Sequence, residues 1–251
     1  MKNKSMEFTV IKKLAARLDQ AFLDLLFPPR CPVCDRVVLP GTGICAACRA
    51  KIRPASHPAC LKCGKPLLDE RKEYCTDCMK NRHIFTQNRA LWVYEDDIKA
   101  SVYRFKYRGR REYAKVYAQE LAERYGSWIK SRGISAIIPV PLSKKKKRKR
   151  GYNQAELLAE ELGRILKLPA YTDLLIRVRD TKPQKTLSAK ERKINLKRAF
   201  KTTQNIVQLQ YILVVDDIYT TGSTLDAAAG ALKEAGAKEV YACCISIGRD
   251  S

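Results

Sequence analysis

Eight cysteines in the first third of the chain have the spacing of metal ligands. They form four C-x-x-C pairs: Cys31/Cys34, Cys45/Cys48, Cys60/Cys63 and Cys75/Cys78. Each C-x-x-C turn can bring two thiolates to one ion, and a spacer of ten or eleven residues returns the next pair to it. Thiolates are soft ligands that suit tetrahedral zinc. The sequence therefore predicts two structural zinc sites, each closed by four sulfur ligands.

The same spacing leaves alternatives open. Four cysteines can also hold an iron–sulfur cluster, and disulfides or a redox role are further possibilities. Consecutive pairs would make two zinc ribbons, whereas interleaved pairs would make a cross-brace, and the short spacers favour the ribbons. Cys243 and Cys244 belong to the apolar run VYACCISI, which predicts buried strand residues.

A second group of residues combines two carboxylates with a turn rich in hydroxyls. It follows an apolar strand and precedes a helix, and its members are Asp216, Asp217, Thr220, Thr221, Gly222, Ser223 and Thr224. Carboxylates can accept hydrogen bonds from the vicinal hydroxyls of a ribose. Hydroxyls and backbone N–H groups at a helix N-terminus suit a phosphate. The pattern of a P-loop is missing, so this group predicts a different kind of phosphate site.

Basic residues dominate the charge of the chain. Its 251 residues include 49 Lys and Arg against 26 Asp and Glu, a formal net charge of +23, which favours nucleic acid, phosphorylated metabolites or an anionic membrane surface as partners. One basic run is uninterrupted: Lys144, Lys145, Lys146, Lys147, Arg148, Lys149 and Arg150. It could pair with a diphosphate or a nucleic-acid backbone, and a solvated charge run is the alternative.

Aromatic residues alternate with basic ones over residues 103–113. The aromatic members are Tyr103, Phe105, Tyr107 and Tyr113. They could stack on nucleic-acid bases while their basic neighbours contact phosphates, or they could be core residues at helical spacing. The chain has only two histidines, His57 and His83, and neither is in a context that suggests catalysis.

The elements that must position these groups alternate between strand and helix. Apolar patterns predict strands over 91–94, 135–141, 170–176, 211–215 and 239–247. Helices are predicted over 96–106, 111–130, 154–166 and 223–235, with Asn153 as an N-cap. This alternation predicts an α/β fold with a parallel sheet flanked by helices, preceded by a small all-cysteine double zinc ribbon. Residues 178–200 are polar and predict a long mobile segment.

Three domains follow from these patterns: an amphipathic helix over 1–27, the double zinc ribbon over 28–85 and the α/β domain over 86–251. The helix rests on Leu14, Leu18, Phe22 and Leu25. No apolar stretch is long enough to predict a membrane span, and charges interrupt any signal-peptide core, so a cytoplasmic protein is expected. A reducing compartment favours metal ligation over disulfides.

Several motifs, in this order, make the chain similar to the ComF family of competence-associated proteins. They are the cysteine pairs, FKYRGR (105–110), IPVPL (138–142), RGYNQAELLA (150–159), RDTKPQKTLSAKERKINLKRAF (179–200) and the strand–acid–hydroxyl stretch of 212–224. That last stretch resembles the 5-phosphoribosyl-1-pyrophosphate (PRPP) signature of type I phosphoribosyltransferases.

The resemblance assigns roles to individual residues. It implies that Asp216 and Asp217 hold the ribose hydroxyls of PRPP, bound with Mg²⁺, and that residues 220–224 hold the 5-phosphate. The segment after Pro141, with the basic run, is implied to meet the pyrophosphate. In purine-salvage relatives the position of Thr220 is an aspartate that acts on the base. Threonine is no general base at neutral pH, so a 6-oxopurine enzyme is not expected.

Two functions compete on this basis. One is a PRPP-binding protein of DNA uptake and natural transformation that handles single-stranded DNA beside other proteins of the uptake machinery. The other is an active phosphoribosyltransferase with an unidentified acceptor, which Arg179, Asp180, Lys182 and Gln184 could meet. No catalytic residue is assigned. A weaker third hypothesis is a transcriptional regulator that reads DNA through its ribbons.

Overall fold

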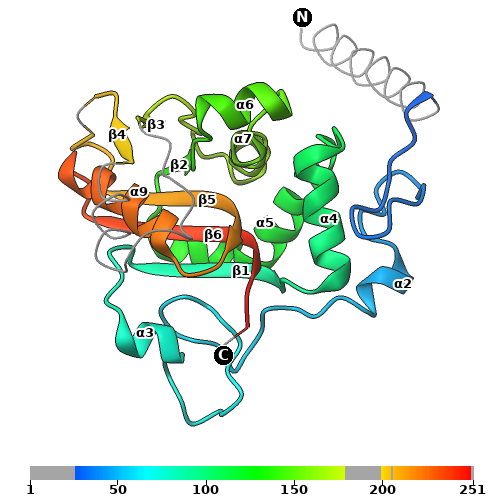
Figure 1. Ribbon diagram of the computed structural model, residues 1–251, viewed down its shortest axis with the longest axis horizontal. Coiled ribbons are helices and arrows are strands. Elements are labelled where there is room, and N and C mark those ends of the chain that lie inside the picture. The colour runs from blue at the N-terminus through cyan, green and yellow to red at the C-terminus, as the bar shows by residue number, and fades with distance from the viewer. Residues whose placement is uncertain (1–25, 179–198, 205, 250–251) are drawn as a thin grey trace, which may run out of the picture.

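A parallel sheet of four strands forms the centre of the computed structural model, which describes residues 26–178, 199–204 and 206–249. The strands are β1 (Gln87–Val93), β2 (Ala136–Pro139), β5 (Tyr211–Tyr219) and β6 (Glu239–Ile247), in the spatial order β1-β6-β5-β2 (Figure 1). The register places Val214 beside Ala242 on one side and beside Ile138 on the other. The predicted parallel α/β fold is confirmed. The predicted N-terminal helix lies almost wholly outside the described residues.

Alternate residues of the central strands enter two separate hydrophobic clusters. Ile212 and Val214 of β5 belong to the cluster that contains helix α9 (Ser223–Glu234). Leu213 and Val215 belong to the cluster that contains α4 (Asp96–Tyr107), α5 (Tyr113–Ser131) and α7 (Gln154–Leu166). Because both faces of the sheet are covered, β5 reads as a continuous apolar run and not as an alternating pattern.

Local signals in the sequence set the ends of several helices. The Asn153 side chain accepts a hydrogen bond of 3.1 Å from the backbone N–H of Ala155, which confirms the predicted N-cap of α7. The basic run forms a short helix of its own, α6 (Lys144–Arg150), which begins after Ser143 and ends at Gly151 with φ +77°. Its charges therefore project from a helix and not from an extended loop.

A small antiparallel sheet joins β3 (Leu175–Arg177) to β4 (Phe200–Thr202). The predicted strand over 170–176 is wrong for most of its length, because only its last two residues belong to β3. Ala170 instead makes an isolated parallel bridge to Ile137. The polar segment 178–200 therefore ends in a strand that its composition did not indicate. Arg179, Asp180, Lys182 and Gln184 lie outside the described residues.

Each ribbon contains one short helix that begins directly after a cysteine. In the first ribbon (residues 26–55) this helix is α2 (Ala46–Arg49), and in the second (residues 56–85) it is α3 (Thr76–Lys80). The first ribbon lies beside α4, whereas the second lies beyond β1 (Figure 1). Cys31 belongs to the cluster of α4 and α5, and Cys63 belongs to the cluster of α9.

A search for membrane-spanning helices, made over the part of the chain that the structure describes, finds none of sufficient length and apolar character.

Candidate functional site

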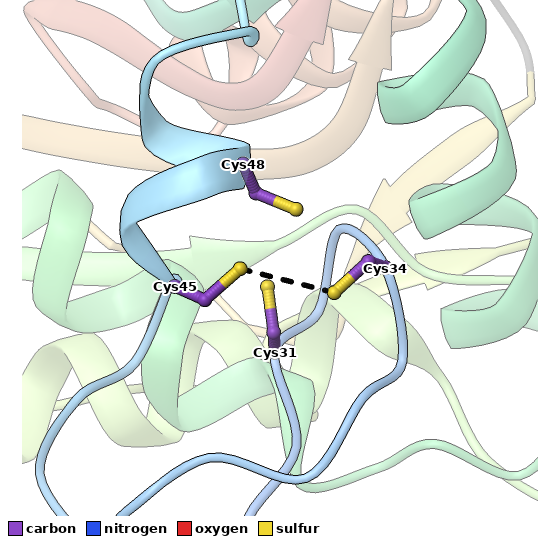
Figure 2. Close-up of side chains that lie close together, drawn as sticks. All are labelled: Cys31, Cys34, Cys45 and Cys48. Atoms are coloured by element: carbon purple, nitrogen blue, oxygen red, sulfur yellow. Dashed lines mark hydrogen bonds between the residues drawn. The ribbon is translucent and has the colours of Figure 1, made fainter.

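The eight paired cysteines converge in two sets of four, and each set comes from consecutive pairs. Figure 2 shows Cys31, Cys34, Cys45 and Cys48 pointing toward one another. In each set the sulfur atoms all lie within 4.8 Å of one another, with separations of 3.9 Å for Cys34–Cys45 and 3.5 Å for Cys63–Cys75. Zinc–sulfur bonds of about 2.3 Å place tetrahedral ligands about 3.8 Å apart, whereas a disulfide needs about 2.05 Å. The arrangement fits two structural zinc sites in a double ribbon and excludes interleaved pairing.

The first ribbon is held to α4 and α5 by polar contacts as well as by packing. Asp35, in a left-handed conformation with φ +64°, accepts hydrogen bonds from Tyr113 at 2.5 Å and from Arg110 at 2.7 Å. Partial burial raises the pKa of Asp35, but these two hydrogen bonds outweigh it and leave the pKa below its usual value. Arg104 of α4 donates to the carbonyl of Val33 at 2.5 Å.

The second ribbon is held to β1 through Asn88, whose side chain is fully buried. The Asn88 amide donates to the carbonyl of Cys63 at 2.8 Å, and its backbone N–H donates to the carbonyl of Lys62 at 2.8 Å. The contact is so close that a Cβ on Gly64 would lie 2.9 Å from the Asn88 carbonyl oxygen. A metal-ligating turn thus packs directly on the edge of the sheet.

The two acids lie within β5, near its carboxyl end. The Asp216 carboxylate accepts from the backbone N–H of Asp217 at 2.8 Å, and Asp217 forms a 2.7 Å ion pair with Lys106 of α4. Both members of that ion pair have side chains only 15% exposed. Burial, and then the neighbouring charge of Asp217, raises the pKa of Asp216 to about 7. The sequence indicated the acids, but it did not indicate that Lys106 is their partner.

The hydroxyl-rich loop (residues 220–224) leads from β5 into α9. Thr221 and Ser223 hydrogen-bond through their hydroxyls at 2.8 Å, and Gly222 is the N-cap of α9 with φ +75°. A Cβ on Gly222 would lie 2.6 Å from the Tyr219 hydroxyl and 2.9 Å from Cε1 of His83. Glycine is therefore required both by the backbone conformation and by the side chains directly behind the loop.

His83, for which the sequence suggested no role, lies behind this loop. Its side chain is 3% exposed, and its Nδ1 lies 2.8 Å from a carboxylate oxygen of Asp226 in the first turn of α9. The partners are 143 residues apart in the chain, so no local pattern could have connected them.

The aromatic residues of 103–113 divide into two groups. Phe105 and Tyr113 are fully buried, so for them the core interpretation is correct. Tyr103 and Tyr107 are 53% and 47% exposed, and their rings lie 5.1 Å apart on the outer side of α4. The Arg150 guanidinium lies 4.7 Å from the centre of the Tyr107 ring and donates to its hydroxyl at 2.9 Å. The end of the basic run therefore meets this aromatic pair.

A cavity of about 510 Å³ lies between the first ribbon and α4. It is lined by Asp35, Ala100, Tyr103, Arg104, Arg108 and Arg110. The Nε of Arg104 is buried without a hydrogen-bond partner, and within the described residues the Arg108 guanidinium has no hydrogen bond or ion pair. Three guanidinium groups beside a single carboxylate favour an anion here.

Within the basic run, residues 144–149 are exposed and Arg150 is half-buried. Lys147 pairs with Glu156 at 3.1 Å, and Arg150 donates to Gln154 at 2.8 Å. In the described part of the chain, no hydrogen bond or ion pair joins Lys144–Arg150 to the acids or to the hydroxyl-rich loop.

A parallel sheet with paired acids and a hydroxyl-rich loop, preceded by two four-cysteine ribbons, defines a phosphoribosyltransferase-like protein with a double zinc ribbon. Comparison with known families agrees: residues 22–79 match the double zinc ribbon domain, and residues 149–250 match the phosphoribosyl transferase domain.

The relatives found by sequence are competence and DNA utilization proteins. Competence protein ComFC of Bacillus subtilis (strain 168) is 32% identical over 203 residues, which cover 78% of this chain and 80% of that protein. Competence protein F of Haemophilus influenzae is 32% identical over 203 residues, with 79% and 87% covered. DNA utilization protein YhgH of Salmonella typhimurium is 31% identical over 218 residues, with 86% and 88% covered. The chain belongs to the ComF family.

Proposed function

We propose that this protein binds PRPP with Mg²⁺ and handles single-stranded DNA in the cytoplasm during DNA uptake, together with other proteins of the uptake machinery. One observation carries the proposal: helix α4 contributes residues to both the candidate PRPP site and the candidate DNA site. Lys106 on α4 pairs with Asp217, while Tyr103 and Tyr107 on the same helix face outward. The names of the relatives, which refer to competence and DNA utilization, support a role in DNA uptake.

The PRPP site in this proposal uses the acids and the loop for different parts of the ligand. Asp216 and Asp217 accept hydrogen bonds from the two ribose hydroxyls, and residues 220–224 surround the 5-phosphate with hydroxyls and N–H groups. Carboxylate oxygens are also the ligands that Mg²⁺ prefers. Lys106 already neutralises one of the two acids, so it must release or share Asp217 when the ribose binds. The basic run is assigned to pyrophosphate or to nucleic acid.

The DNA site in this proposal is the exposed side of α4 and the adjoining cavity. Bases stack on Tyr103 and Tyr107, while Arg104, Arg108 and Arg110 contact phosphates. Stacking suits every base, and a guanidinium contacts phosphate without reading sequence. Little sequence preference and strong dependence on salt are therefore expected.

Active phosphoribosyl transfer is the alternative, and the intact acid pair favours it. With a pKa of about 7, Asp216 could exchange a proton near neutral pH. No residue of the described chain is assigned to activate an acceptor, so binding is the function that we prefer.

Three measurements on one preparation separate these functions. Calorimetry with PRPP and Mg²⁺ should show binding that Asp216→Asn with Asp217→Asn weakens strongly, whereas the control Asp96→Asn, at a fully exposed side chain, leaves it unchanged. Fluorescence anisotropy should show single-stranded DNA binding that weakens steeply with salt. Pyrophosphate release with any base or nucleoside tested would establish the enzyme instead. Unchanged PRPP affinity in the double variant would remove the site assignment, and absence of DNA binding even at low salt would remove the DNA function.

A further inference from the structure

His83 is buried where the second ribbon meets the hydroxyl-rich loop. Its ring stacks on Phe85 with centroids 4.8 Å apart, and its Nε2 lies 3.5 Å from the Tyr219 hydroxyl. On the loop side, a Cβ on Gly222 would lie 2.9 Å from Cε1 of His83. The ring therefore supports the loop backbone from the protein interior.

The contact between His83 and Asp226 affects the charge at the start of α9. Asp226 lies in the first turn of α9, where free N–H groups favour negative charge, so its carboxylate competes with any phosphate bound there. Both of its oxygens are occupied by groups from the end of the second ribbon. His83 Nδ1 contacts Oδ2 at 2.8 Å, and the backbone N–H of Ile84 donates to Oδ1 at 2.6 Å. Because a carboxylate only accepts, His83 must carry a hydrogen on Nδ1.

The same contacts connect the loop to the second ribbon. Phe85, Tyr219 and Leu225 share one hydrophobic cluster with Cys60, Cys63 and Cys75. His83 follows the last ligand of that set, Cys78, by five residues in the sequence. The buried cysteines of the first ribbon, Cys31 and Cys48, belong instead to the other cluster.

We propose that His83 is a positioning residue for the anion site: it turns the Asp226 carboxylate away from the phosphate and couples the loop to the second zinc ribbon. This inference rests on the proposed phosphate role of residues 220–224. It adds to that role a residue, and a dependence on one of the two metal sites, that the ligand-binding groups do not themselves require.

The test is a double-mutant cycle between His83 and Asp226, with ribose 5-phosphate as the probe and calorimetry as the readout. His83→Ala leaves a charged carboxylate without its partner, so affinity should fall by about tenfold or more. Asp226→Asn alone should change affinity little. The double variant His83→Ala with Asp226→Asn should recover most of the loss, because the uncompensated charge is gone. His83→Asn, which keeps a donor near the position of Nδ1, should bind better than His83→Ala.

His57→Ala is the matched control, because His57 is the other histidine and is exposed. Each variant is first checked for an unchanged zinc content. A purely structural role for His83 would produce losses that Asp226→Asn adds to and does not repair. Wild-type affinity in His83→Ala, or failure of the double variant to recover, would overturn the proposal.

Hydrogen–deuterium exchange of the ligand-free protein separates this inference from the proposed function. His83→Ala should speed exchange at residues 219–225 while the later turns of α9 stay protected. If wild type binds no ribose 5-phosphate but the loop loosens in this way, the phosphate function fails, and with it the anion-site role of His83, so that only its structural support of the loop is left. If binding is seen but neither affinity nor exchange changes in His83→Ala, the phosphate site stands and the positioning role is wrong.

Discussion

Burial, and then the neighbouring charge of Asp217, raises the pKa of Asp216 to about 7. Near pH 6 it is mostly protonated and is a poorer acceptor for ribose hydroxyls and a poorer ligand for Mg²⁺. We therefore expect affinity for PRPP with Mg²⁺ to rise between about pH 6 and about pH 8. Calorimetry across this range measures it. Asp216→Asn, which cannot ionise, is the control, and an equally steep pH dependence in that variant would assign the effect to the ligand.

The same raised pKa predicts how stability depends on pH. Between the ordinary pKa of an aspartate and about 7, the folded chain keeps a proton on Asp216 that the unfolded chain has lost. The contribution of this proton is present at low pH and disappears as pH rises through about 7. The free energy of unfolding of wild type, minus that of Asp216→Asn, should thus decrease from about pH 5.5 to about pH 7.5. Urea denaturation above the range in which zinc ligands protonate measures this difference, and a rise would contradict it.

Adding a single methyl group at Gly222 should have a large effect on stability and on binding. Gly222→Ala combines a left-handed backbone with contacts of 2.6 Å to Tyr219 and 2.9 Å to His83. We expect it to lower the free energy of unfolding by about 2–3 kcal/mol and to weaken ribose 5-phosphate binding. Gly109→Ala has a similar φ of +70° with nothing within 4 Å, so it reports the backbone cost alone. Equal destabilisation by both variants would show that the contacts behind the loop do not matter.

At the scale of elements, helices α4 and α6 offer two kinds of contact to a single strand of DNA. Tyr103→Ala should weaken binding by about 1–3 kcal/mol and leave the salt dependence unchanged, because stacking releases no counterions. Neutralising Lys145, Lys146, Lys147 and Arg148 should flatten the slope of log K against log salt, by about 0.7 for each phosphate contact removed. Anisotropy titrations over a salt series distinguish the two classes.

Tyr74→Ala is a suitable control for the stacking variant, because Tyr74 is also exposed but lies in the second ribbon. If the lysine variants lose PRPP affinity while DNA binding is unchanged, the basic run serves pyrophosphate, and the DNA assignment of α6 is withdrawn.

The elements differ in how far the sequence could predict them. Helix α7 with its Asn153 cap and strand β6 have the predicted bounds, because a side-chain cap and a long apolar run are local signals. Strand β4 has three residues and depends on pairing with β3, which a local pattern does not encode. The same reason applies to the site: the acids and the loop are contiguous and were predictable, whereas Lys106 and His83 reach them only through the tertiary fold.

For the whole molecule, the important feature is that the buried cysteines of the two ribbons belong to different hydrophobic clusters. We expect two zinc ions per chain, and about one per chain in Cys31→Ser or Cys63→Ser. Cys63→Ser should mainly weaken ribose 5-phosphate binding, because its ribbon supports the loop through His83. Cys31→Ser should mainly weaken binding of single-stranded DNA, because its ribbon supports α4 through Asp35 and Arg104.

Metal analysis and the two binding assays on each variant check this division. Cys243→Ser is the control, because Cys243 is fully buried but belongs to neither set, so this variant should keep both zinc ions despite some loss of stability. Equal losses of both affinities in the two ribbon variants would mean that the ribbons act on the whole fold and not on separate sites.

The strand order carries a consequence for how the chain is made. Strand β6 lies between β1 and β5, so β1 has no partner in the sheet until the ribosome has synthesised β6, where Tyr241 pairs with Gln87. At about 5–20 residues per second, a ribosome needs roughly ten to thirty seconds to cover that interval. The ribbons are complete long before it ends and can take up zinc while the chain is still growing. The edge of β1 that β6 will pair with keeps its backbone N–H and C=O groups unpaired meanwhile, so the emerging chain is a candidate client for chaperones that bind nascent polypeptides.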